Sequence, residues 1–274
     1  MNTNPPGPPG WEVGTAPWAR RRIAECAIEA ASLGRKTVPV GPFRACFDPS
    51  TDLIWLNYAV PVWALAPPAE TQLQLEQLRT TFHEHGRRLR FEFIDGIWPR
   101  LVEELERFGL TLQTRAPLMW VTPESFVPCG REDLTVRLVQ AHETDVLAEM
   151  HDVQQRAFGA DAVPATDAEI AQLQHQIANG FWRCAIAESR GEVAGIGTLV
   201  LTNTVAELAG VGTLPEYRRR GIASALSSYL LMRQFEMGGE LVWLSAGDDT
   251  ARMVYEKIGF RVVGEQLHYI EPET

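Results

Sequence analysis

The sequence predicts a mixed α/β fold built from two related halves. Segments with helical spacing of apolar residues alternate with β-rich segments along all 274 residues, a length that suits two domains. A short helix–glycine–strand unit also occurs once in each half. Turn residues between neighbouring β-rich segments indicate hairpins, so we expect mixed, mostly antiparallel sheets flanked by helices.

The first half, residues 11–125, follows a stretch at 1–10 that is rich in proline and glycine and is expected to be a mobile tail. Gly86 is expected to end one helix, and Pro117 to interrupt the last strand. Apolar periodicity predicts helices at 18–33, 69–86 and 98–109, and β-rich composition predicts strands within 37–48, 52–62, 89–94 and 110–122.

The second half, residues 134–274, follows a linker at 126–133 in which proline and glycine supply turn chemistry. It repeats the alternation more fully. Helices are predicted at 141–158, 166–180, 222–235 and 249–259, and strands at 181–189, 192–202, 206–214, 240–246 and 260–270.

An internal repeat connects the halves at an offset of 150 residues. The sequence VEELERFGLTL in the first half is similar to MVYEKIGFRVV in the second. Gly109 then falls on Gly259, Leu110 on Phe260, and Leu105 on Tyr255. Together with the similar order of elements, this indicates a duplicated unit.

Composition excludes several classes of protein. The chain has 25 Lys and Arg against 35 Asp and Glu, a formal charge of −10, so no basic stripe for nucleic acid is expected. No apolar run has the length of a membrane span. The sequence therefore predicts a protein that binds neither nucleic acid nor membrane.

The cysteines and histidines give no metal or disulfide pattern. The four cysteines are scattered and are expected to be reduced thiols of a cytoplasmic protein: Cys26, Cys46, Cys129 and Cys184. His83 and His85 flank Glu84, but a metal site needs more ligands within reach, so we expect an exposed helix end and no metal.

The stretch PEYRRRGIASAL, residues 215–226, is the strongest functional signal. A strand leads into it and a helix follows it. Helix N-termini attract anions through free N–H groups and the helix dipole, provided that the turn lacks bulky side chains, as Gly221 and Ala223 ensure. The cationic side chains of Arg218, Arg219 and Arg220 suit phosphate oxygens. This segment predicts a pyrophosphate site, the alternative being a solvated helix start.

The segments VGTLPEYRRRGIASALSSYLL and DDTARMVYEKIGF together resemble the GNAT superfamily of acetyl-CoA-dependent N-acetyltransferases over about residues 134–270. The family's R/Q-x-x-G-x-G/A pattern, which cradles the coenzyme A pyrophosphate, is matched in full by residues 218–223. In the family's N-x-x-A-x-x-x-Y-x-x-x-G-F pattern, Asp248 replaces the asparagine while Tyr255 and Gly259 match. The first half resembles a diverged copy without the cofactor loop.

The resemblance implies that the chain binds acetyl-CoA through one set of residues, in which Val211 to Thr213 offer backbone groups to the pantetheine and thioester. We expect room beside Gly212 for a ligand or another backbone. The expected cofactor-binding residues are Val211, Gly212, Thr213, Arg218, Arg219, Arg220, Gly221, Ile222, Ala223, Ser224 and Asp248.

Glu207 and Tyr255 are the expected catalytic residues of direct acetyl transfer to a primary amine. Glu207 lies on the strand that leads to the cofactor loop and would act as base, unless a water chain does so and Glu207 only faces solvent. Strand alternation would place Glu207 and Val211 on one face of the sheet. Tyr255 would protonate the departing thiolate, or would only bury its ring.

A second function stays open, that of a non-catalytic sensor or partner module that binds coenzyme A or an acyl-CoA. The acceptor is expected to be a small-molecule or peptide amine that the sequence does not identify. The first half is expected to bind no coenzyme A and to shape the acceptor side, or else to complete a sheet or form a homodimer interface.

Overall fold

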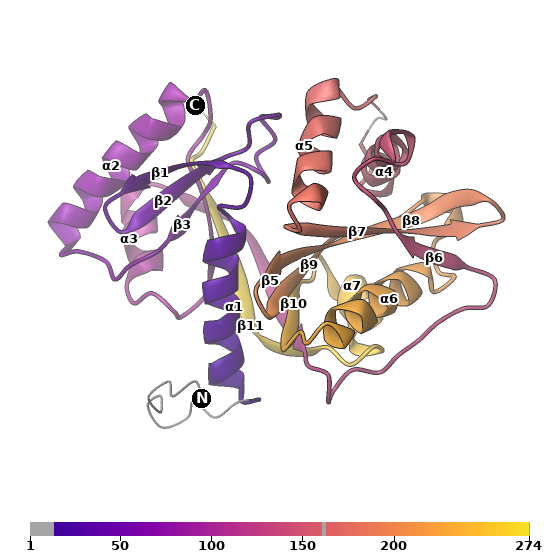
Figure 1. Ribbon diagram of the computed structural model, residues 1–274. Coiled ribbons are helices and arrows are strands. Elements are labelled where there is room, and N and C mark those ends of the chain that lie inside the picture. Colours follow the sequence, from indigo (N-terminus) through magenta and orange to yellow (C-terminus); the bar gives the residue numbers. More distant parts are fainter. Residues whose placement is uncertain (1–13, 161–162, 274) are drawn as a thin grey trace.

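The computed structural model describes residues 14–160 and 163–273, so the expected tail at 1–10 lies outside the described residues. All its strands belong to one eleven-stranded mixed sheet, and helices cover both faces (Figure 1). The fold class expected from the sequence is confirmed. The halves share one continuous sheet, with strand order β1-β2-β3-β4-β11-β5-β10-β9-β8-β7-β6.

The first half contributes the strands at one end of this sheet together with three helices. Its elements are α1 (Ala16–Ala30), β1 (Lys36–Val40), β2 (Phe43–Phe47), β3 (Tyr58–Pro61), α2 (Pro68–Glu84), β4 (Arg90–Ile94), α3 (Leu101–Phe108) and β5 (Thr111–Val121).

The second half contributes the other end of the sheet and four α-helices. Its elements are β6 (Thr135–Leu138), α4 (Thr144–Ala157), α5 (Asp167–Ala178), β7 (Trp182–Ser189), β8 (Glu192–Thr202), β9 (Val205–Thr213), the 3-10 turn η1 (Pro215–Tyr217), α6 (Ile222–Glu236), β10 (Leu241–Ser245), α7 (Asp249–Glu256) and β11 (Arg261–Ile270).

The last strand of each half pairs with the other half. β5 of the first half is antiparallel to β10, and β11 of the second half is antiparallel to β4. At the centre of the sheet, β5 and β11 pair with each other. The first pair of this ladder is Trp120↔Arg261 and the last is Thr111↔Ile270, and the repeat offset of 150 residues converts one pair into the other. The duplicated units are therefore related by an approximate twofold axis through this pair.

The two copies of the helix–glycine–strand unit have the same local geometry. Gly109 follows α3 with φ 96°, and Gly259 follows α7 with φ 99°, a left-handed conformation that favours glycine at the end of a helix. At Gly259 a Cβ atom would also lie 2.0 Å from the carbonyl oxygen of Ser125, so no other residue fits there.

The sheet's two faces carry different helices. α6 and α7 cover one face of the second half, and α4 and α5 the other. α1 lies over the central strands, where Trp18 and Ile23 form a core with Val205 of β9 and Trp243 of β10 (Figure 1). α1 therefore contacts both halves on the face that α4 and α5 also cover.

One sequence expectation about elements is wrong, one predicted strand is shorter than its segment, and one strand was missed. β5 runs unbroken through Pro117, and the register shift nearest to Pro117 lies in its partner β11, between Val262 and Gly264. The predicted strand at 52–62 forms only at Tyr58–Pro61. β6 was not predicted, because its four residues are too few to show a period.

No helix in the described ranges has both the length and the hydropathy of a membrane span.

Candidate active site

β9 and β10 are neighbouring parallel strands that diverge after a short paired segment. They pair at three positions, from Leu241↔Val205 to Trp243↔Glu207. β9 continues to Thr213, while β10 stays paired with β5. The β9 backbone groups that point toward β10 beyond Glu207 thus have no strand partner. We call this place the strand opening.

A β-bulge bends β9 next to the strand opening. Between the pairs Thr198↔Ala209 and Ile196↔Gly212, two residues of β9 face one residue of β8. One of them, Gly210, has φ 60°, which suits a bulged glycine. The bulge reverses the alternation of side chains.

Val211 consequently packs with the core under α6, whereas Glu207 shares the opposite face with Val205 and α1. The expectation that Glu207 and Val211 share a face is therefore wrong. Bulges bend a strand and often lie beside functional sites, because they re-aim side chains.

Gly212 is a glycine for a reason that the sequence did not show. A Cβ atom there would lie 2.9 Å from the Cβ of Ala157, at the end of α4. The end of α4 therefore occupies the space beside Gly212. A ligand at this position could contact only the backbone of β9. The carbonyl of Thr213 is partly engaged, since it accepts a hydrogen bond from Arg218 Nε at 3.3 Å.

The loop after β9 leads into an uncapped helix. Gly221, with φ 74°, occupies the N-cap position of α6, where no side chain accepts a hydrogen bond from the first turn. That turn also carries no acidic residue. Ile222 points into the core and offers only its backbone, while Ala223 and Ser224 are small and half-buried. The free N–H groups and small residues fit a pyrophosphate.

The three arginines of the loop have different environments. Arg218 donates to the carbonyl of Ala157 at 2.7 Å and so ties the loop to α4. The Arg220 guanidinium lies 5.4 Å from the centre of the Tyr217 ring. Arg219 is exposed, has φ 60°, and makes no ion pair with the described residues. The guanidinium groups of Arg219 and Arg220 are therefore available to bind an anion.

Asp248 and Tyr255 lie at the two ends of α7. Asp248 Oδ1 accepts a hydrogen bond from Ala251 N at 2.7 Å and caps the helix, a role that aspartate and asparagine fill equally well. The Tyr255 ring packs edge-on against Phe260, 5.7 Å between centres. Burial raises the pKa of Tyr255 to about 12, so its phenol keeps the proton at neutral pH.

Glu207 is the carboxylate at the point where β9 and β10 diverge. It makes no hydrogen bond or ion pair with the described part of the chain. Burial, together with the nearby charge of Glu92, raises the pKa of Glu207 to about 7, and Arg35 opposes the rise. A carboxyl group with this pKa exchanges its proton near neutral pH.

The two predicted catalytic residues lie on opposite faces of the sheet. Tyr255 packs with the core under α6, while Glu207 lies on the α1 face. Sequence reasoning missed Arg35 and Glu92 from the first half, whose charges act on Glu207, and Tyr58, on which the charge of Glu207 acts. They carry no motif, and only the shared sheet brings them near β9.

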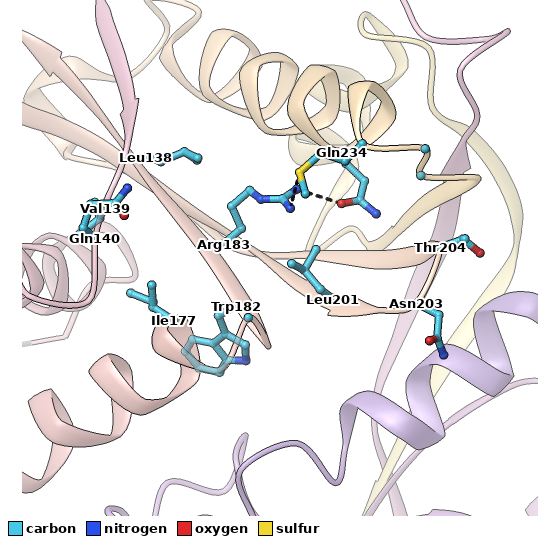
Figure 2. Close-up of a pocket in the computed structure, with 14 residues that line it drawn as sticks. Leu138, Val139, Gln140, Ile177, Trp182, Arg183, Leu201, Asn203, Thr204 and Gln234 are labelled. Atoms are coloured by element: carbon cyan, nitrogen blue, oxygen red, sulfur yellow. Dashed lines mark hydrogen bonds between the residues drawn. The ribbon is translucent and has the colours of Figure 1, made fainter.

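A separate hollow of about 460 Å³ lies at the other end of α6 (Figure 2). Arg183 is the basic side chain within it, and its guanidinium donates to Gln234 Oε1 at 2.9 Å and to Met237 Sδ at 3.0 Å. A cation at a helix C-terminus stabilises the helix, which explains this arginine. The 15-residue α6, roughly 22 Å long, separates the hollow from the cofactor loop.

Comparisons with known proteins agree with this geometry. Residues 147–260 match the model of the Acetyltransferase (GNAT) family. A GCN5-related N-acetyltransferase from Kribbella flavida is 26% identical, with 93% of this chain and 96% of that chain covered and a TM-score of 0.76.

Two further solved structures share the fold across most of the chain. A GCN5-related N-acetyltransferase from Sphaerobacter thermophilus is 16% identical, with 94% of each chain covered and a TM-score of 0.65. A tandem GNAT protein from the clavulanic acid biosynthesis pathway is 15% identical, with 86% of this chain and 80% of that chain covered and a TM-score of 0.60.

A search of curated protein sequences gives no match. The family match includes β8, β9, the loop at 214–221 that carries the three arginines, α6, β10 and α7. Residues 147–260, in the second half, therefore carry an acyltransferase domain of the GNAT family, and the whole chain shares its fold with GNAT proteins.

Proposed function

We propose that this protein transfers an acetyl group from acetyl-CoA directly to a primary amine, with Glu207 as base and Tyr255 as acid. The observation that carries the proposal is the Glu207 carboxyl, unpartnered and with its pKa raised to about 7, at the start of the strand opening. A general base works best when its pKa lies near the working pH.

The base is needed because amines are protonated at neutral pH. An alkylamine with a pKa of about 10.4 is neutral in only about one molecule in 2,500 at pH 7, a cost of about 4.6 kcal/mol. Glu207 takes a proton from the bound ammonium, which frees the nitrogen lone pair for attack. Its raised pKa makes it a stronger proton acceptor than an ordinary carboxylate.

Part of the predicted set is best suited to hold acetyl-CoA. The N–H groups at the start of α6, with Gly221, Arg219 and Arg220, would bind the pyrophosphate, and the β9 backbone at 211–213 the pantetheine. When bound, acetyl-CoA supplies the acetyl thioester. Asp248 is occupied as the cap of α7.

Tyr255 lies on the face of the sheet opposite to Glu207. Its phenol, with a pKa of about 12, holds a proton that a departing thiolate can accept. Glu207 therefore removes a proton from the amine on the α1 face of the sheet, and Tyr255 donates a proton to the sulfur on the α7 side.

The first half is proposed to bind no coenzyme A and to shape the acceptor side. Its counterpart of Tyr255 is Leu105, which is fully buried and has no proton to donate. Its counterpart of α6 begins at Pro67 and Pro68, which lack N–H groups for an anion. Arg35, Tyr58 and Glu92 of this half instead interact electrostatically with Glu207.

A thiol-release assay tests the function. The full chain is incubated with acetyl-CoA and a panel of amines, and free coenzyme A is measured with a thiol reagent. An enzyme releases thiol only with an accepted amine, and Glu207→Gln lowers this rate. A protein that binds acetyl-CoA and yet releases no thiol with any amine is the non-catalytic module instead.

A further inference from the structure

Side chains from both halves form a polar cluster around Glu207. Glu92 on β4 lies opposite His268 of β11 in the strand register. Arg35 precedes β1, and its guanidinium lies 5.0 Å from the centre of the Tyr58 ring at the start of β3. We call Arg35, Tyr58, Glu92, Glu207 and His268 the junction cluster.

One carboxylate of the junction cluster is neutralised locally. Arg90, 1% exposed, contacts Glu92 Oε1 at 2.5 Å and His268 Nδ1 at 3.0 Å. Its guanidinium also lies 4.8 Å from the centre of the Trp55 ring. Glu92 therefore has its countercharge within the protein, although its charge still contributes to the raised pKa of Glu207.

Two charges of the cluster have no such partner. Arg35 donates to the carbonyl of Ala31 at 3.3 Å and lies against Tyr58, but it forms no ion pair with a described carboxylate. Glu207 forms no ion pair with a described cation. The two are near enough to affect each other's charge without touching, and the Tyr58 hydroxyl lies in the field of both.

We infer that Arg35 binds a carboxylate of the acceptor, so that the substrate is an amine that also carries a carboxylate, as an amino acid does. This inference rests on the proposed function. The ammonium of such a molecule faces Glu207 and its carboxylate faces Arg35. Glu207 and Arg35 would then each form an ion pair with the substrate. An arginine fork binds a carboxylate through two parallel hydrogen bonds, which gives both strength and orientation.

The second half holds Arg35 in position for this task. Gln172 and Gln176 of α5 donate to the carbonyls of Gly34 and Leu33, at 2.9 and 3.2 Å. Gly34 has φ 64°, and a Cβ atom there would lie 2.2 Å from Gln176 Nε2, so the turn before Arg35 is packed tightly against α5. A preorganised guanidinium loses little entropy on binding.

An unpaired polar atom lies on the Glu92 side of the junction cluster. His268 Nε2 is buried and has no hydrogen-bond partner among the described residues, while its Nδ1 is used by Arg90. Buried polar atoms are rarely left unpaired in native proteins. A polar ligand or ordered water in the junction cluster would satisfy it.

The test compares matched acceptors on the full-length protein. Each of the common amino acids is assayed by thiol release against its carboxamide and its decarboxylated amine. We expect at least one amino acid to exceed both neutral counterparts at least tenfold in kcat/KM. Arg35→Met should reduce that ratio to about twofold or less, mainly through KM, and Arg35→Lys should keep part of it.

Controls separate recognition from folding. Arg88→Met removes an exposed arginine of the first half that pairs with Glu273, and it should leave the ratio unchanged. Melting temperature reports whether each variant is folded. Calorimetry of the preferred amino acid, with free coenzyme A present, should show at least tenfold weaker binding to folded Arg35→Met.

The outcomes are distinguishable. Acetylation of neutral amines as fast as of their amino-acid counterparts overturns the inference and keeps the proposed function. Equal loss on all acceptors in folded Arg35→Met means that the junction cluster only joins the halves. No thiol release with any amine contradicts the proposed function itself.

Discussion

Ala116 and Gln266, equivalent positions of the internal repeat, lie directly opposite each other in the β5–β11 pair. The register around them is symmetric, with Leu267 facing Arg115 and Glu265 facing Pro117. The Arg115 and Glu265 side chains, 150 residues apart, form an ion pair across this centre. The approximate twofold axis therefore passes through this residue pair, and each half depends on the other for a neighbouring strand.

The shared strands predict that the halves do not fold separately. A fragment of residues 11–125 leaves β4 without β11, and its own β5 without both of its partners. Exposed strand edges pair with other chains, so we expect aggregation or loss of structure. Circular dichroism and light scattering of the fragment measure this, and co-expression with 126–274 should restore soluble protein. A cooperatively melting monomer would contradict the prediction.

Gly221→Val should weaken acetyl-CoA binding at least tenfold in a folded protein. A Cβ atom at Gly221 meets nothing closer than 3.7 Å, so the fold bears only the cost of a left-handed backbone, about 1–2 kcal/mol. The side chain would block the approach of a phosphate to the first N–H groups of α6. Calorimetry with acetyl-CoA measures the loss.

Gly86→Val is the matched control for this variant. Gly86 has φ 66°, and a Cβ atom there would meet nothing within 4 Å. Its strain is therefore comparable, but it lies at the end of α2, away from the cofactor loop. Equal acetyl-CoA affinity in both folded variants would reject the pyrophosphate site.

Tyr255→Phe should retain acetyl-CoA affinity and lower turnover by about 10²–10⁴-fold, the usual contribution of a general acid. It removes the hydroxyl and keeps the ring that packs on Phe260. Single-turnover acetyl transfer is the measurement, because it excludes product release. Tyr229→Phe on α6 is the control, and equal rates in the two variants would assign Tyr255 to packing.

Glu207→Gln should stabilise the protein at neutral and alkaline pH but hardly at acidic pH. The pKa of Glu207 is raised from 4.5 to about 7 in the folded state, so ionisation disfavours folding and stability falls as pH rises through this window. The full effect is on the order of 3 kcal/mol. Urea unfolding at pH 5 and pH 8 should show a gain for the variant at pH 8 and little at pH 5.

The neighbours of Glu207 decide how this effect is interpreted. Glu92, Arg35, Tyr58 and Cys26 are the titratable groups that interact with it. Glu92→Gln should lower the pKa of Glu207, so the acid limb of the kcat/KM profile should move to lower pH. An equal change in stability at both pH values for Glu207→Gln would show that its carboxyl is not the group that titrates.

The sequence predicted the elements whose signals are local. Helices and hairpins follow from apolar spacing and turn residues, and the arginine loop follows from its small residues before α6. The exchange of β5 and β11 has no local signal, because it depends on pairing between segments about 150 residues apart. Arg35 and Glu92 were missed for the same reason, and the side chain of Val211 was misplaced because a bulge is invisible in the alternation of residues.

The continuity of the sheet also limits how substrates enter. Proteins that close around a ligand usually bend at a few hinge residues between domains, on microsecond to millisecond timescales. Here β4, β11, β5, β10 and β9 are hydrogen-bonded in succession across the middle of the molecule, which leaves no hinge between the halves. Access to Glu207 must therefore depend on smaller and faster rearrangements of loops and side chains.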